Sequence, residues 1–147
     1  TYGLPVIYST HPRSRKFIEQ RRFQFHPLVR NVTPLGFLDY NHLQQNALCV
    51  LSDSGTLSEE SALLGFCGVL IRTSTERPEV LDKGTVVIGG IQSESMAQAA
   101  EMAIAMQRNR EPRALPADYE DTNVSVKVVK LIQSYTQIVN QTVWLKR

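Results

Sequence analysis

Several features that define whole classes of protein are scarce in this 147-residue chain. The two cysteines, Cys49 and Cys67, form no CxxC pair and have no histidine nearby, so we expect buried free thiols in a reducing cytoplasm and no metal site. No apolar run approaches the roughly 18 residues that span a bilayer. The formal net charge is only +2, which argues against a general attraction to polyphosphates. Disulfide scaffolds and membrane-spanning proteins are therefore excluded.

The composition is that of a globular protein, with 42% hydrophobic and 20% charged residues, and the length suits about one domain. The opening, TYGLPVIYSTHPR, has no basic segment followed by an apolar one, as a signal peptide would have. It enters a strand-like run almost at once and has no initiator methionine. We therefore expect an excised piece of a longer chain.

Short apolar runs alternate with helical patterns along the first 110 residues. The runs predict strands at 4–8, 48–52, 68–72 and 85–89, and an extended segment at 32–37 that Pro34 interrupts. The patterns between them predict helices at 13–23, 38–47, 56–65, 76–84 and 93–109. Short strands that are apolar throughout suit a parallel sheet covered on both faces. The alternation therefore predicts an α/β fold with a doubly wound parallel sheet.

The composition changes near residue 110, where prolines and charges gather in REPRALPADYEDTN. We interpret 111–123 as a connector between a lobe at 1–110 and a C-terminal crossover helix at 124–147. The helical pattern runs to about 142 and places Val128, Ile132, Tyr135 and Val139 on one stripe.

The segment SDSGTLSEES, residues 52–61, predicts a strand end, a tight turn and a helix start. Thr56 and Glu59 fit a capping box, which gives Glu59 a structural explanation. Glu60 points roughly 100° around the helix and has no such explanation. The backbone N–H groups of the turn favour an anion such as a phosphate, and Glu60 could accept two ribose hydroxyls. The alternative is an ordinary capped helix that binds nothing.

A second motif, TSTERPE, follows the next predicted strand. Pro78 suits the first turn of a helix. Arg77 would then stand at the same edge of the sheet, where its fork of donors could reach a diphosphate. The alternative is a surface arginine paired with Glu76 or Glu79.

Residues 11–30 carry six Lys or Arg against one Glu, with phenylalanines between them. Such a pattern occurs in nucleic-acid binders, but a solvated helix face explains it better, and we expect no nucleic-acid partner and no membrane partner.

Together, DSGTLSEESALLG and IRTSTERPEVLDKGTVVIGG resemble the non-hydrolysing UDP-N-acetylglucosamine 2-epimerase family, and the resemblance runs from about Pro5 to the end. The sequences of the two motifs are most similar to those of the branch that forms UDP-N-acetyl-L-fucosamine for capsule and O-antigen synthesis. The resemblance implies a GT-B-like fold of two Rossmann-like lobes, of which this chain resembles the second, without that lobe's first strand and helix.

The resemblance also assigns roles to residues. UDP would be bound by Ser54, Gly55, Thr56, Glu60 and Arg77, with an aromatic near the uracil at Tyr40 and backbone groups from Leu35 to Phe37. Thr56 departs from the family, where glycine is commoner, and Leu35 replaces a glutamine that often contacts uracil. His11 matches a histidine that belongs to an allosteric site in some members.

Members of the family eliminate UDP to give a 2-acetamidoglycal and then add it back on the other face, without a cofactor. Their acid and base residues lie in segments that this sequence does not contain, so we expect no catalytic residue here. The resemblance implies a UDP-sugar partner, a missing N-terminal lobe and a homodimer of the full-length protein. A GT-B glycosyltransferase donor lobe and a non-catalytic UDP-sugar-binding module are the alternatives.

Overall fold

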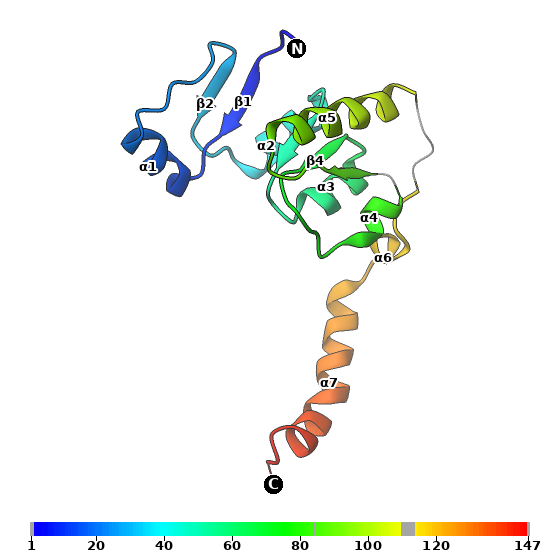
Figure 1. The fold of residues 1–147 in the computed structure, drawn as a ribbon. Helices are drawn as coiled ribbons and strands as arrows, with labels where there is room; N and C mark the ends of the chain where they lie inside the picture. Colours follow the sequence, from blue (N-terminus) through cyan, green and yellow to red (C-terminus); the bar gives the residue numbers. More distant parts are fainter. Residues whose placement is uncertain (1, 84, 110–113, 147) are drawn as a thin grey trace. The chain divides into compact units, whose positions relative to one another are not determined.

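The computed structural model describes residues 2–83, 85–109 and 114–146, which form two compact units, residues 1–48 and 49–147. The boundary between the units falls inside the lobe predicted at 1–110, and the predicted division into lobe, connector and crossover helix stays a prediction. Each unit alternates strands with helices, and every strand pair is parallel, as the sequence predicts (Figure 1).

The first unit contains two strands and two helices: β1 Val6–Ser9, α1 Pro12–Gln20, β2 Val29–Val32 and α2 Phe37–Asn46. β1 pairs with β2 in a register that places Val6 opposite Val29. Thr10, which is completely buried, donates its hydroxyl to the side chain of Asn31 and so ties the ends of the two strands together.

Two predictions in the first unit are wrong in their boundaries. The sequence predicts an extended segment at 32–37, but the strand in this region, β2, begins before it and ends at Val32. The strand does not continue because Pro34 has no N–H to donate to a neighbouring strand. Helix α1 ends at Gln20 and not at residue 23, because Arg22 adopts a positive φ of 48°, which no helix continues.

The second unit is built on β3 Val50–Ser52, β4 Gly68–Leu70 and β5 Val86–Ile88, which lie in sequence order with β4 in the centre. The helices are α3 Leu57–Leu64, α4 Pro78–Asp82, α5 Ser93–Arg108, α6 Ala117–Glu120 and α7 Val124–Thr142. α6 lies within the predicted connector and was not expected. Gly65 ends α3 with a φ of +75°, as predicted, whereas Gly84, the expected end of α4, lies outside the described residues.

Helices lie on both faces of the three-stranded sheet, and its central strand β4 is buried along its whole length (Figure 1). One face packs on α3 and α4 around a buried cluster. The cluster contains Leu57, Phe66, Leu70, Val80 and Val86, none more than 4% exposed.

Helix α5 covers the other face of the sheet. The small residues Ala99 and Ala103 of α5 are buried. Gly89 lets the helix approach, because a Cβ at this position would lie 2.7 Å from Val69 Cγ1 and 3.4 Å from Met96 Cα.

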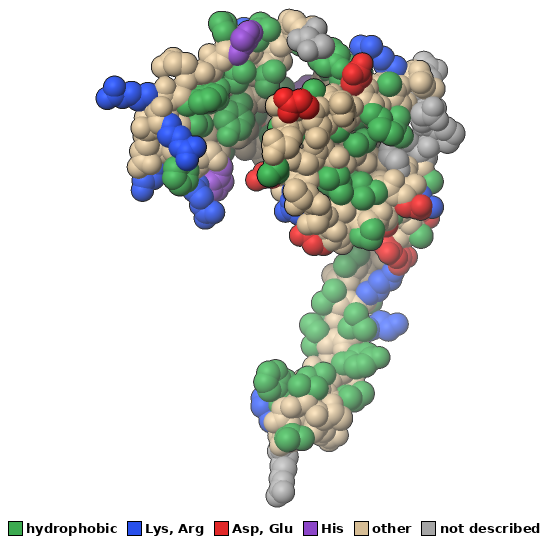
Figure 2. Space-filling model, viewed as in Figure 1, with side chains coloured by type: hydrophobic (Ala, Val, Ile, Leu, Met, Phe, Trp, Pro, Cys, Tyr) green, Lys and Arg blue, Asp and Glu red, His purple; other side chains and the backbone are tan. Residues whose placement is uncertain are grey.

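The predicted stripe of α7 is present but exposed. Its four members, Val128, Ile132, Tyr135 and Val139, are between 36% and 60% exposed, and hydrophobic side chains are visible along this helix in Figure 2. In the described part of the chain, every helix is too short or too polar to cross a bilayer.

Candidate functional site

The loops that follow β3 and β4 lie at one edge of the second unit's sheet, where parallel strands present their carboxyl ends. β3 ends at Ser52, and the turn that follows leads into α3 at Leu57. β4 ends at Leu70, and its loop leads into α4 at Pro78. The two motifs that the sequence singles out are therefore neighbours in space, as predicted.

The turn after β3 is held by its own side chains. The Ser54 N–H donates to the Ser52 hydroxyl at 3.1 Å, and the hydroxyls of Ser54 and Thr56 lie 2.9 Å apart in a hydrogen bond. Leu57 N–H donates to Ser54 O at 3.3 Å, which starts the first turn of α3. The exposed side chains of Ser54 and Thr56 are thus placed at the start of a helix, where N–H groups favour an anion.

The capping box predicted between Thr56 and Glu59 is wrong. Thr56 has helical dihedral angles, φ −67° and ψ −16°, and its side chain makes no capping bond. An N-cap residue requires an extended backbone for its hydroxyl to reach back to the helix. Because Thr56 is already helical, its hydroxyl bonds Ser54, and the carboxylate of Glu59 is left to another partner.

That partner is Arg77, at the other side of the site. The Arg77 Nε–H donates to Glu59 Oε1, and the backbone N–H of Arg77 donates to Thr75 Oγ1 at 3.1 Å. A Cβ on Gly55 would lie 3.3 Å from Arg77 Nη1, so the guanidinium lies directly against the glycine of the turn. The predicted neighbourhood of Arg77 and the turn is confirmed.

The alternative pairing of Arg77 holds only in part. Arg77 Nη1 is 3.9 Å from Glu76 Oε2, a long contact, and Glu79 bonds instead to the Tyr119 hydroxyl at 2.8 Å. The hydrogen bond that Arg77 donates to Glu59 raises the pKa of Arg77, so its guanidinium is positively charged at neutral pH.

A second arginine, Arg72, lies at the same turn and was missed in the sequence. Its Nε–H donates to Asp53 O at 2.6 Å, and its Nη1 donates to Glu76 Oε2 at 2.9 Å. A Cβ on Gly55 would lie 4.0 Å from Arg72 Nη2. The available signal was its place two residues after the end of β4, which puts it at the same edge of the sheet as Arg77.

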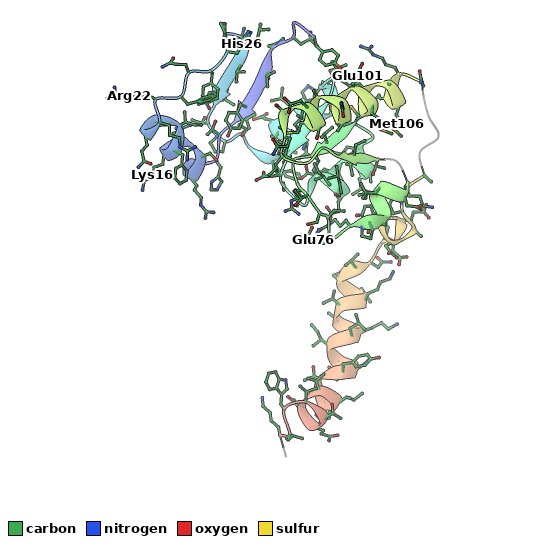
Figure 3. All side chains as sticks on the ribbon, viewed as in Figure 1. Lys16, Arg22, His26, Glu76, Glu101 and Met106 are labelled. Atoms are coloured by element: carbon green, nitrogen blue, oxygen red, sulfur yellow. The ribbon has the colours of Figure 1, made fainter. Side chains whose placement is uncertain are left out.

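Glu76 therefore lies between two arginines, in the loop that precedes α4 (Figure 3). A hydrogen bond from its own backbone N–H lowers the pKa of Glu76, and the positive charge of Arg72 lowers it further. With its side chain 68% exposed, this carboxylate is held only loosely.

Glu60, the predicted ribose ligand, lies half-buried in the first turn of α3, next to Glu59. Its N–H donates to Thr56 O at 2.9 Å, which places it on the regular part of the helix. Glu59 and Glu60 thus point in different directions, and Glu59 is paired with Arg77.

The other predicted site residues belong to the first unit. Leu35 precedes α2, Phe37 is its first residue and is 77% exposed, and Tyr40 is half-buried one turn into it. His11 is the N-cap of α1, where its Nδ1 accepts the N–H of Arg13 at 3.2 Å. The structure describes the two units separately, so the roles of these four residues stay predictions.

Among the residues that the structure describes, no three His, Cys, Asp or Glu side chains are grouped as a metal site would require. Cys49 and Cys67 are free, half-buried and buried respectively, which confirms the expectation of free thiols. Their side chains are neighbours, and a hydrogen bond to Cys67 raises the pKa of Cys49. This pair lies at the start of β3 and β4, at the opposite end of the strands from the Gly55 turn.

Comparison with known proteins gives a consistent result. Residues 1–133 match the sequence model of the family described as UDP-N-acetylglucosamine 2-epimerase. A protein of that name from Methanocaldococcus jannaschii is 30% identical over 112 residues, which cover 74% of this chain and 31% of the relative. The chain thus spans about a third of the length of such relatives.

Solved structures agree in fold. The UDP-N-acetylglucosamine 2-epimerase from Rickettsia bellii superposes with a TM-score of 0.81 and 35% identity, over 99% of this chain and 40% of that one. The M. jannaschii enzyme in complex with UDP-GlcNAc and UDP superposes with a TM-score of 0.75 and 25% identity, over 88% and 36% of the two chains. The predicted α/β, Rossmann-like fold class is confirmed.

Proposed function

Since this chain belongs to the UDP-N-acetylglucosamine 2-epimerase family, we propose that it supplies the UDP-binding half of a UDP-sugar 2-epimerase. The enzyme would invert C2 of a UDP-2-acetamido sugar by eliminating UDP and adding it back. Family membership favours this activity over that of a GT-B glycosyltransferase. The sequences SDSGTLSEES and STERPE favour the branch of the family that makes capsule and O-antigen precursors. We expect the enzyme to act in the cytoplasm.

The observation that carries the proposal is the guanidinium of Arg77 against the Gly55 turn. Two features that commonly bind phosphate lie together there: the N–H groups at the start of a helix and the guanidinium of an arginine. Arg72 adds a second positive charge at the same turn. Ser54 and Thr56 offer hydroxyl donors, and Glu60 is on the same helix for the ribose.

In the elimination step, negative charge develops on the departing diphosphate. Arg77 and the start of α3 would stabilise that charge, and the guanidinium of Arg77 is already held by its bond to Glu59 before the ligand arrives. Tyr40 and the backbone from Leu35 to Phe37 would hold the uracil. We place the acid and base that act at C2 in a further N-terminal lobe, and we expect the full-length protein to be a homodimer. Epimerisation of UDP-GlcNAc by these 147 residues alone would overturn that division.

A titration with UDP, monitored by calorimetry or NMR, tests the proposal. We expect UDP to bind more tightly than uridine or inorganic phosphate, because the site contacts both parts of the ligand. Arg77→Ala should weaken UDP binding by at least about tenfold, since it removes charge-assisted hydrogen bonds to the diphosphate.

Arg108→Ala is the matched control, because Arg108 is an exposed arginine in the last turn of α5. It should leave the affinity unchanged. If wild-type protein binds no UDP at millimolar concentrations, or if Arg77→Ala binds it as well as wild type, the proposed site is wrong. UDP binding by a full-length protein that has no epimerase activity would favour the non-catalytic module.

A further inference from the structure

Glu59 is a carboxylate at the candidate site that the proposed function leaves without a role. It lies in the first turn of α3, with its side chain 32% exposed. Its Oε1 accepts the Nε–H of Arg77, whereas its Oε2 is buried and has no hydrogen-bond partner in the described part of the chain. A carboxylate oxygen that is buried without a partner carries a desolvation cost, so this placement needs an explanation other than stability.

The pairing uses only one of the donors of Arg77. Glu59 takes the Nε–H, at the inner end of the guanidinium. The outer nitrogens are left for other contacts, and Nη1 lies against Gly55. Because the guanidinium is planar, fixing Nε also fixes the plane and direction of the outer fork.

Both partners stand on fixed backbone. The neighbours of Glu59, Leu57 and Ser58, are at most 1% exposed, and Leu57 packs against Gly68 of the central strand. On the other side, the Arg77 N–H is bonded to Thr75, and Val80 in the helix that follows is completely buried. The pair thus joins α3 to the start of α4 across the site.

We infer that Glu59 is a positioning residue that orients the Arg77 fork toward a diphosphate bound at the Gly55 turn. The inference rests on the proposed function, since it concerns how that site holds its ligand. An ion pair this exposed contributes little to the stability of the fold. Its effect is to remove the freedom of a long side chain before the ligand binds, which strengthens binding without adding a contact. Glu59 itself does not contact the ligand.

Glu59→Gln tests the inference, because glutamine keeps the size of the side chain and removes its charge. We expect UDP and inorganic pyrophosphate to bind about tenfold more weakly, a loss of about 1.4 kcal/mol. The loss should be equal for the two ligands, since both present a diphosphate. In an Arg77→Ala background, adding Glu59→Gln should change the affinity less than about twofold, because a residue that acts through Arg77 has nothing left to orient.

Glu101→Gln is the control, because Glu101 is exposed on α5 (Figure 3). It should bind both ligands as wild type does. The Nε–H resonance of Arg77 in ¹⁵N NMR, identified by its loss in Arg77→Ala, gives a readout without ligand. It should exchange slowly with water in wild type and quickly in Glu59→Gln, whereas the melting temperatures stay within about 2 °C of each other.

The outcomes separate the two ideas. Wild-type binding of UDP with equal affinity in Glu59→Gln overturns the positioning role and leaves the proposed function intact. Equal loss from Glu59→Gln in the wild-type and Arg77→Ala backgrounds also overturns it, because Glu59 would then act independently. Absence of UDP binding by wild type overturns the proposed function, and the positioning role with it.

Discussion

Strands β1 and β4 are both short, apolar and paired in parallel, yet they differ completely in burial. All three residues of β4 are buried, with Val69 and Leu70 at most 1% exposed. In β1, Val6 and Ile7 are about half exposed. β4 has a strand on each side and helices on both faces, whereas β1 has a single neighbouring strand in its unit. Apolar sequence thus predicts a strand, but the number of packed neighbours decides what that strand contributes to stability.

The largest effect should come from truncating a residue of the central strand. Leu70→Ala should lower the free energy of unfolding by about 2–5 kcal/mol, because it leaves a cavity in the cluster around Leu57 and Val86. Ile7→Ala, the matched change in β1, should cost about 1 kcal/mol or less, since Ile7 is 49% exposed. Urea unfolding followed by circular dichroism measures both. Equal losses would show that burial does not separate the two strands.

A smaller effect is expected where the sheet meets α5. Gly89→Ala should destabilise the chain by about 1–3 kcal/mol, because the added methyl would lie 2.7 Å from Val69 Cγ1. Gly36→Ala in the first unit is the control, since its methyl would meet nothing closer than Asp39 Oδ2 at 3.8 Å. It should stay within about 0.5 kcal/mol of wild type in the same urea experiment. A neutral Gly89→Ala would mean that the Val69 side chain and the helix can shift to make room for the methyl group.

The smallest effect should come from a single buried hydroxyl. Ser61 in α3 is 1% exposed, and its hydroxyl lies 2.7 Å from Phe66 O and 2.8 Å from Thr85 O. Ser61→Ala should cost about 1–2 kcal/mol, because those carbonyls lose their donor inside the core. Ser134→Ala on the exposed face of α7 should change thermal stability by about 0.5 kcal/mol or less. A loss no larger for Ser61 than for Ser134 would contradict the assigned bonds.

The local features of the fold could be predicted from the sequence. Periodicity gave the type of nearly every element, and Gly65 marked the end of α3. The alternation of strands and helices in the sequence predicts the Gly55 turn and Arg77 at one edge of the sheet. These predictions depend on residues that are close in sequence, or on a rule about where parallel strands end.

The pairings across the site could not be predicted in the same way. The pattern Thr56-x-x-Glu59 fits a capping box, but the actual bond of Glu59 reaches the next loop, and only the backbone angles of Thr56 decide between the two. The bond from Tyr119 to Glu79 likewise joins the connector to α4. The periodic pattern of apolar residues correctly predicts an apolar face on α7, but a pattern within one helix does not indicate what covers that face.

The register of the central sheet has a consequence for how the chain folds. Val50 pairs with Gly68, and Gly68 pairs with Val86, so the two crossovers around β4 contain the same number of residues. By length alone, closing either loop costs about the same conformational entropy. Crossover length therefore favours neither outer strand, and the two differ in their side-chain contacts: Val86 of β5 is a member of the buried cluster, whereas in β3 Val50 packs on the cluster only partly buried and Leu51 is 48% exposed.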